Sequence, residues 1–469
     1  MKRWRVYLML QLCVLARFPV VAVAQTTAQS GPPQALTLEA AIQYASEHYP
    51  AVRAALEQVN ASAAGVDVAR SAYLPRLDSV WQSNRGTTNN IFGQVLPQTV
   101  IPALTGPVLS SPSSESVWGS AAGALFSWEP FDFGLRRASI ASAEAALAQA
   151  RAGEALTRLD VQAAVAGAYL GMAAAQRAVI ATQADLERRN VLLQSVQTLV
   201  ANQLRPGADQ SRVEAERAAA QTRLIQAEQT VAVAQATLNR VLGASGNITI
   251  AADALIARVP GGDMAPANAS AHPLAQLRQA SVDEARGQQG VLAHTDLPRV
   301  FIQSSVFARG SGANATGVFE GGLDGLGLQR ANWAAGVEVL FPNVFDVSSL
   351  RARKAAAAAT ARASAALYDE ALLSVTSQQQ TAEAVLHAAR AIAANTPVQL
   401  AAAQQSETQA RARYDAGLAT IVEVADAQSL LAQAEVQDQL ARVDVWRALL
   451  AAAVAQGDLR PFLTVLRQP

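Results

Sequence analysis

The chain has 469 residues, of which 16% are charged and 51% are hydrophobic, and its acidic and basic residues balance to a net charge of zero. A chain this apolar and this neutral is not intrinsically disordered, and the charge balance argues against a polybasic nucleic-acid binder. Aromatic residues make up only 5%, so the apolar excess is mostly Ala, Val and Leu. This composition favours long, closely packed helices.

The first 24 residues have the pattern of a signal peptide. A basic start precedes an apolar run over residues 6–16, and Ala22-Val23-Ala24 fits the small-residue rule for cleavage before Gln25. The alternative is a first buried helix, since the run is too short to span a bilayer. Removal of this segment takes away Cys13, the only cysteine, so we expect an exported protein without disulfides or thiol chemistry.

The mature chain begins with two helices, a strand and a loop. Thr37 is a good N-cap for a helix over residues 38–48, and Pro50 opens a second helix to about residue 73. Strand character follows over residues 76–85. Residues 86–114 contain four evenly spaced prolines, which no helix tolerates, so we predict a loop there.

A second strand and two long helices follow. Residues 117–128 are rich in small and aromatic residues. The sequence has no proline from Leu135 until Pro206, which predicts a helix of about 105 Å at 1.5 Å per residue. Another long helix is expected from about Asp209 to Leu242. Runs of alanine in these segments permit the close helix packing of coiled coils.

The second half of the chain repeats the first at fixed offsets. Tyr49-Pro50 and Leu74-Pro75-Arg76 have counterparts 223 residues later, whereas Phe131-Asp132 and Leu242-Gly243 have counterparts 214 residues later. The offset changes within the proline-rich loop, so the second copy has a shorter loop. We therefore divide the chain into a signal peptide, a first structural repeat, a linker or equatorial segment, a second structural repeat and a C-terminal tail. Their ranges are 1–24, 25–243, 244–271, 272–457 and 458–469.

The second repeat is expected to contain a helix, two strands and two long helices, of which the first is interrupted at Pro397. Their ranges are 273–295, about 300–309, 332–341, from about 348, and 420–456. In the strand over 332–341, Trp333, Val337 and Phe341 share one face with other apolar residues. Such alternation over about ten residues is typical of an outer-membrane strand.

Four strands of one chain cannot close a barrel, and lipid does not tolerate an open sheet edge. Either the sheet is soluble, or several chains pool their strands. Trp118 and Trp128 bracket the second strand, and Trp333 lies in the fourth. In the second case we expect these three indoles at or near the lipid interface, because an indole is apolar in its body and carries one polar donor.

Four motifs occur in a specific order. They are Leu36-Thr37-Leu38-Glu39-Ala40-Ala41 followed by Tyr49-Pro50, Leu74-Pro75-Arg76, Trp128-Glu129-Pro130-Phe131-Asp132-Phe133-Gly134, and the segment from Tyr414 to Gln428. Over nearly the whole mature chain they resemble the TolC-type outer-membrane efflux channel family, the outer membrane factors. The resemblance implies a mainly α fold with a small transmembrane β part. A homotrimer would form a 12-stranded β-barrel, continuous with a long, coiled-coil-like α-helical barrel in the periplasm.

The resemblance also implies a function and partners. The chain would be a subunit of an exit duct for small molecules, such as drugs and toxic compounds, from a tripartite efflux pump. A periplasmic adaptor protein, an inner-membrane transporter and outer-membrane lipid would be its partners, with no cofactor and no nucleic acid. The alternatives are the exit channel of a type I protein secretion system and a structural trimeric coiled-coil envelope protein. We expect no enzyme and no metal site, because the four histidines share no metal-ligand spacing and no nucleophile motif occurs.

In the resembling family, the periplasmic entrance lies where the long helices turn back. Acidic residues at the positions of Glu423 and Asp426 line its narrowest ring, where three chains would place carboxylates that attract cations. Both residues also suit an ordinary helix start, because Thr420-x-x-Glu423 is a capping box. The family further implies that Asp209 accepts a hydrogen bond from Tyr414, which helps to hold the entrance shut; the alternative for Asp209 is a plain N-cap.

One departure from the family concerns the gate, since its best-known member has an arginine where this chain has Ala419. That part of the lock should be missing or replaced. The two helix turns are the expected docking tips for the adaptor. Their residues are Leu204, Arg205, Pro206, Gly207, Gly417, Leu418 and Ala419.

Overall fold

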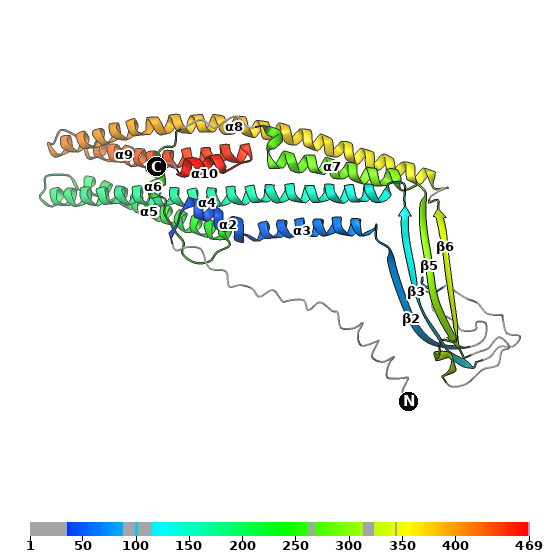
Figure 1. Cartoon of the computed structure of the whole chain (residues 1–469). Helices are drawn as coiled ribbons and strands as arrows, with labels where there is room; N and C mark the ends of the chain where they lie inside the picture. The colour runs from blue at the N-terminus through cyan, green and yellow to red at the C-terminus, as the bar shows by residue number, and fades with distance from the viewer. Residues whose placement is uncertain are drawn as a thin grey trace.

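The structure is a computed structural model that describes residues 35–87, 99–101, 114–261, 268–312, 323–342 and 345–467. The expected signal peptide lies outside the described residues, as does most of the proline-rich loop. Within the described part, long helices run side by side, and a small sheet extends from the end of the molecule opposite the hairpin tips (Figure 1).

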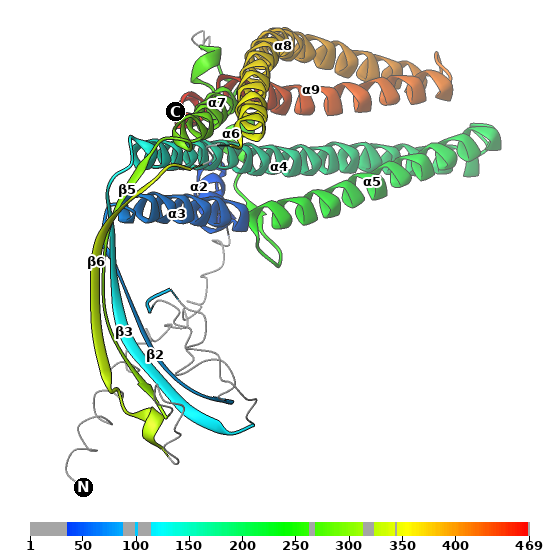
Figure 2. The same cartoon turned by 90° about the vertical axis from the view of Figure 1, so that its right-hand side faces the viewer.

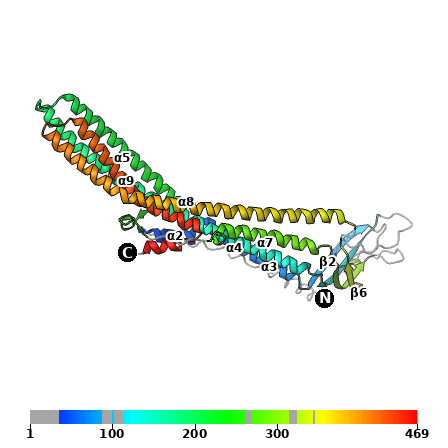
Figure 3. The same ribbon diagram turned by 90° about the horizontal axis from the view of Figure 1, so that it is seen from above.

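Two helical hairpins dominate the molecule. The first pairs α4 (Leu135–Ala201) with α5 (Gly207–Leu242), and the second pairs α8 (Val347–Asp415) with α9 (Ile421–Gln456). Their turns lie together at one end (Figure 3). These bounds confirm the long helices expected from the proline-free, alanine-rich segments.

Shorter helices extend the two hairpins towards the sheet. The helix α3 (Pro50–Ser71) packs along α4, and α7 (Pro273–His294) packs along both α4 and α8. Both begin with proline in the first turn, where its missing N–H would have no helical partner in any case. Thr37 caps α2 (Leu38–His48) by accepting a hydrogen bond from the Ala40 amide at 3.3 Å, as its sequence indicates.

A compact apolar core surrounds the middle of α4 and the C-terminal half of α9. It is completed by α2, the short helix α6 (Asp253–Ile256), the C-terminal helix α10 (Arg460–Arg467) and the parallel pair β1 (Ala35–Leu36) and β4 (Thr249–Ile250). Tyr169 and Trp446 are fully buried there, and Phe462 of α10 meets the Trp446 ring edge to face. The segment that we named a tail therefore contains a helix of eight residues, about two turns, which is too short to be recognised by its periodicity in the sequence.

The sheet has four antiparallel strands in the order β2 (Arg76–Thr87), β3 (Ser116–Phe131), β5 (Arg299–Ser311) and β6 (Arg330–Leu340). It curves strongly (Figure 2), with a convex and a concave side. Two 3-10 turns complete the described elements, η1 (Ala269–Ala271) and η2 (Asp324–Leu326). A rod built of coiled coils alone does not account for this sheet.

The expectation that Pro397 interrupts the helix is wrong, because α8 runs continuously from Val347 to Asp415 with Pro397 inside it. Proline removes one backbone donor and crowds the carbonyl four residues earlier, here that of Ala393. The neighbouring Thr396 is fixed by a hydrogen bond from its hydroxyl to Asp438 of α9 at 3.0 Å. Packing against α9 therefore keeps α8 helical across Pro397, where sequence propensity alone would favour a break.

Candidate functional site: the hairpin tips and the sheet surface

The two hairpin tips are joined by a small apolar cluster. Its buried residues are Leu192, Val196, Val213, Tyr414, Ala419, Ile421 and Val424. They come from all four long helices, so the cluster fixes the first tip against the second. Ala419, expected on the docking surface, has a side chain buried in this cluster.

Both turns use the same backbone conformation. Gln203 and Gly417 have positive φ angles of 62° and 76°, and the amide of the next residue, Leu204 or Leu418, donates back to the carbonyl five residues earlier at 2.8 Å. This is the Schellman type of helix ending. In consequence each tip presents one exposed leucine, 68% exposed at Leu204 and 72% at Leu418.

Tyr414 of the second hairpin is the side chain that contacts the first tip. Its ring is 2% exposed, and the Arg205 guanidinium from the first tip lies 4.4 Å from the ring centroid while its Nη2 donates to the Tyr414 carbonyl at 3.0 Å. Arg205 thus clamps the second hairpin through both a cation–π contact and a charged hydrogen bond.

The Tyr414 hydroxyl has no hydrogen-bond partner in the described part of the chain. Burial raises the pKa of Tyr414, the charge of Arg205 lowers it, and those of Asp209 and Asp415 raise it. Asp209 is therefore close enough to act by its charge. The hydrogen bond between Tyr414 and Asp209 that the resemblance implies is not formed in this conformation of the single chain.

Glu423 and Asp426 lie one turn apart on the exposed side of α9. Glu423 completes the capping box, since its amide donates to the Thr420 hydroxyl at 3.4 Å and its carboxylate accepts from the Thr420 amide at 3.3 Å. The same carboxylate lies 3.9 Å from Arg413. Asp426 has no ion pair among the described residues, so its charge is the freer of the two.

The convex face of the sheet carries the tryptophans, because the segment 99–101 lies inside the curve (Figure 2) and packs on Ala121 of the opposite face. The pairing register places Trp118, Trp128 and Trp333 on one face. Trp333 is 79% exposed, and the Trp128 indole N–H donates to the Tyr73 carbonyl at 3.1 Å, where the sheet joins the helices.

Trp81 of β2 belongs to the same face and is 65% exposed. We did not expect it in this role, because residues 76–85 alternate weakly. The sequence did contain an indication of this role, because Leu77 and Trp81 are four residues apart and therefore lie on the same face of the strand.

The concave face is more polar, although a small apolar cluster around Ala121 also lies on it. Asp78 and Gln82 of β2, Gln303 of β5 and Glu338 of β6 lie on it, and the Gln303 amide contacts the Glu338 carboxylate at 3.4 Å. A sheet that is apolar and aromatic outside and more polar inside matches the wall of an outer-membrane barrel around water.

Among the described residues, the two outer strands of the sheet, β2 and β6, each have one edge that pairs with no other strand. Within the described residues β2 pairs only with β3, and β6 pairs only with β5. Every residue of β6 is exposed. Lipid does not tolerate unpaired backbone groups, so these edges require another strand.

Comparison with known proteins decides the family. The sequence model described as outer membrane efflux protein matches residues 41–244 and 267–457. The chain belongs to the outer membrane efflux protein family. The gap between the two matched segments, residues 245–266, lies within the region that we named a linker.

Individual relatives agree with this assignment. The chain is 27% identical over 436 residues to Protein CyaE of Bordetella pertussis, covering 90% of this chain and 84% of that protein. Its fold is similar to that of the outer membrane protein VceC of Vibrio cholerae, with a TM-score of 0.70, 19% identity, and coverage of 90% of this chain and 96% of the other. It is also similar to the open state of the MtrE outer membrane channel of Neisseria gonorrhoeae, with a TM-score of 0.70, 19% identity, and coverage of 90% and 89%.

These findings confirm the family, the fold class and the location expected from the sequence. The chain is a subunit of an outer-membrane efflux channel, with a β part in the outer membrane and long helices that extend into the periplasm. Its family and fold are those of channels rather than enzymes.

Proposed function

We propose that three copies of the chain assemble into one duct, in which β6 of each copy pairs with β2 of the next. The open edges of both strands support this arrangement, since pooled strands close the barrel that one chain cannot close. Exposed apolar side chains along α8 supply the matching helical contacts. They include Leu373, Val385, Ile392 and Val398.

This duct carries small molecules, such as drugs and toxic compounds, from a tripartite pump to the outside. The observation that carries the proposal is the two-sided sheet, which is apolar and aromatic on its convex face and more polar on its concave face. The sequence contains no phosphate-binding glycine loop that would let the chain use a nucleotide as an energy source. An inner-membrane transporter therefore drives transport, and a periplasmic adaptor connects it to the tips at Leu204 and Leu418.

Complementation of a strain without efflux channels tests the proposed function. A strain that lacks its native outer-membrane efflux channels and expresses this chain with its cognate adaptor and transporter should regain resistance to small toxic compounds. The purified protein should run as a heat-modifiable trimer and conduct ions in planar bilayers. Secretion of a polypeptide without any gain in resistance would instead support the type I secretion alternative.

The same lipid setting tests the aromatic face. Brominated lipid should quench tryptophan fluorescence from Trp118, Trp128 and Trp333, and also from Trp81. If none of the four tryptophans is quenched, the sheet does not lie in the membrane.

At the periplasmic end, we assign the pore constriction to Glu423 and Asp426. In the trimer their six carboxylates form a ring that binds cations. The Arg205 clamp on Tyr414 takes the place of the arginine that is absent at Ala419, and Asp209 supports it by its charge near the tyrosine.

A further inference from the structure

A single charged side chain lies on the convex face of the described strands. The pairing register places Arg85 of β2 directly opposite Trp118 of β3, on that face. Glu129, in the bulge of β3, is paired with Arg299 at 2.7 Å. The other charged residues of the four strands all lie on the concave face, and they are Arg76, Asp78, Arg299, Arg309, Arg330 and Glu338.

Arg85 lies at the outer end of the apolar band of the sheet. Trp118 and Trp128 are ten residues apart on β3, which corresponds to about 33 Å along a strand. At the usual tilt of an outer-membrane strand, this distance spans about 25 Å of the bilayer, the height of the apolar band. Trp128 lies where the sheet joins the helices, through its hydrogen bond to Tyr73. Trp118 and Arg85 therefore lie at the end of the strands that points away from the helices (Figure 2).

The Arg85 guanidinium is positioned by β3 without being neutralised. Its Nε donates to the Ser116 hydroxyl at 3.1 Å, and its central carbon lies 5.7 Å from the centroid of the Trp118 ring. Within the described residues, its two terminal nitrogens make no hydrogen bond and it forms no ion pair. Ser83 and Thr87 are exposed beside it on the same face. A free pair of N–H groups flanked by hydroxyls suits a phosphate attached to a sugar.

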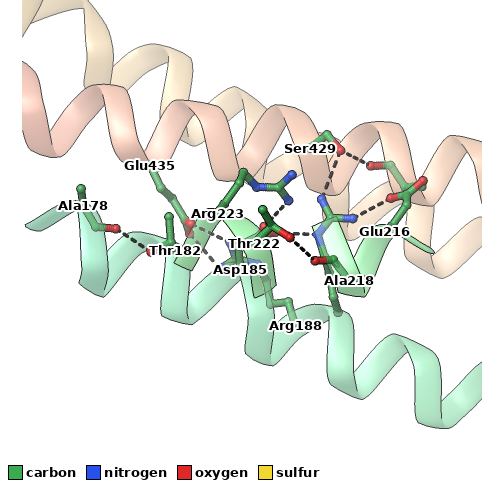
Figure 4. A network of polar contacts seen from close by, with 12 residues as sticks. Ala178, Thr182, Asp185, Arg188, Glu216, Ala218, Thr222, Arg223, Ser429 and Glu435 are labelled. Atoms are coloured by element: carbon green, nitrogen blue, oxygen red, sulfur yellow. Dashed lines mark hydrogen bonds and ion pairs between the residues drawn. The ribbon is translucent and has the colours of Figure 1, made fainter. Parts of the chain in front are cut away.

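Two buried arginines show how this chain neutralises such a charge when it serves the fold. At the inner end of the sheet, Arg136 pairs with Asp132 at 2.8 Å. In the first hairpin, Arg189 pairs with Asp185 at 3.0 Å, within the network of polar contacts that Figure 4 shows. Arg85 has no such carboxylate partner in the described part of the chain, so its charge is available to an external anion.

We propose that Arg85 and Trp118 form a binding site for the phosphorylated sugar headgroup of lipopolysaccharide, the glycolipid of the outer leaflet. An arginine on the lipid face is costly at the centre of a bilayer but tolerated at the headgroup level, where its charge meets phosphate. The inference rests on the outer-membrane location of the sheet and goes beyond the proposed function, because it concerns the lipid around the duct rather than its cargo. In the proposed trimer, β6 of the next copy brings no charged residue to the convex face, so each duct has three such sites.

Binding of lipid A, the phosphorylated anchor of that glycolipid, to the purified full-length trimer tests the site. Native mass spectrometry of the trimer in a nonionic detergent counts the bound molecules, and we expect three. Arg85→Gln should weaken binding about tenfold or more, because a charged bidentate contact is lost. Arg85→Lys keeps the charge without the planar fork and should weaken binding severalfold. Lipid A stripped of its phosphates should bind the parent as weakly as intact lipid A binds Arg85→Gln.

Arg330→Gln is the matched control. Arg330 is also exposed and lies towards the outer end of a strand, but on the concave face, opposite Arg309. This variant should bind lipid A as the parent does. Phosphatidylglycerol, which has one phosphate diester and no sugar, should bind at least about tenfold more weakly than lipid A, and an equal concentration of inorganic phosphate should not displace lipid A. Trimer recovery on unheated gels shows that each variant assembles.

The possible outcomes separate the lipid site from the duct itself. An Arg85→Gln trimer that binds lipid A as tightly as the parent would overturn the site and leave the proposed function intact. Equal weakening by Arg330→Gln, or equally tight binding of phosphatidylglycerol, would also overturn it, because binding would then follow general attraction of anions. A parent that neither assembles nor forms a pore would overturn the proposed function, whereas lipid A binding to its separate subunits that is lost in Arg85→Gln would still support the site.

Discussion

The two hairpin tips have the same backbone turn but different chemistry. At the residue that needs a positive φ, the first tip has Gln203 and the second has Gly417. At the start of the returning helix, the first has Pro206 without a side-chain cap, whereas the second has Thr420 in a capping box with Glu423. Identical turns can therefore be reached with or without the residues that best suit them.

The difference assigns separate tasks to the tips. The first tip supplies Arg205, which holds Tyr414 of the other hairpin. The second supplies the exposed carboxylates of Glu423 and Asp426. In the duct that we propose, the first tip holds the second hairpin, and the second tip carries the negative charge of the constriction.

The largest expected effect comes from removal of that charge. With Glu423→Ala and Asp426→Ala combined, a trivalent cation added on the periplasmic side should block the purified channel at least about 100-fold less tightly, because six carboxylates around one axis supply most of its Coulombic attraction. Planar-bilayer recordings measure this directly. If the trivalent cation blocks the double variant as tightly as the parent channel, both carboxylates act only as helix caps.

The single variants rank the two carboxylates. Asp426→Ala should weaken the block more than Glu423→Ala, since Glu423 is also engaged by Thr420 and lies 3.9 Å from Arg413. The reverse order would mean that the capping contacts do not restrain Glu423 in the assembled channel.

Docking should depend on the exposed leucines of both tips. Leu418→Asp and Leu204→Asp each place a charge where an apolar adaptor contact is expected, so export should fall about tenfold or more, while trimers and bilayer conductance persist. Replacement of Gly417 by a bulky residue should have a similar effect. Leu56→Asp, on α3 away from the tips and also exposed, serves as the comparison for an exposed leucine without an assigned role. Normal export by both tip variants would move the docking site elsewhere.

A smaller effect separates the arginine clamp from the tyrosine hydroxyl. Arg205→Ala removes a cation–π contact and a charged hydrogen bond, and we expect it to raise resting conductance about fivefold. Tyr414→Phe keeps the ring and deletes a hydroxyl that has no hydrogen-bond partner among the described residues, so its effect should be below about twofold. A larger effect of Tyr414→Phe would show that the trimer supplies the hydroxyl with a partner, Asp209 being the first candidate.

The sequence predicted the long elements well because they follow from local rules. Proline-free runs, the proline at position 50 and the Thr420 cap all act within one or two helical turns. The contacts that join distant elements were not predictable. The contact of Arg205 with Tyr414 and the position of Trp81 on the convex face each depend on which helices or strands become neighbours. Pro397 misled the prediction for the same reason, because packing along α9 keeps its helix continuous.

The smallest effect concerns the turns themselves. Gly417→Ala forces a side chain into the positive-φ region, at a cost of about 1 kcal/mol. Local opening of the second tip should then become about fivefold more frequent, which hydrogen exchange at the Leu418 amide reports, because that amide is bonded to the Arg413 carbonyl at 2.8 Å. Gln203→Gly relieves the same strain in the first tip and should slow exchange at the Leu204 amide, bonded at 2.8 Å to the Leu199 carbonyl. Its gain should be smaller than the loss at Gly417, since added glycine flexibility favours the open turn. Faster exchange in both variants would mean that side-chain contacts of Gln203, rather than backbone strain, set the stability of the first tip.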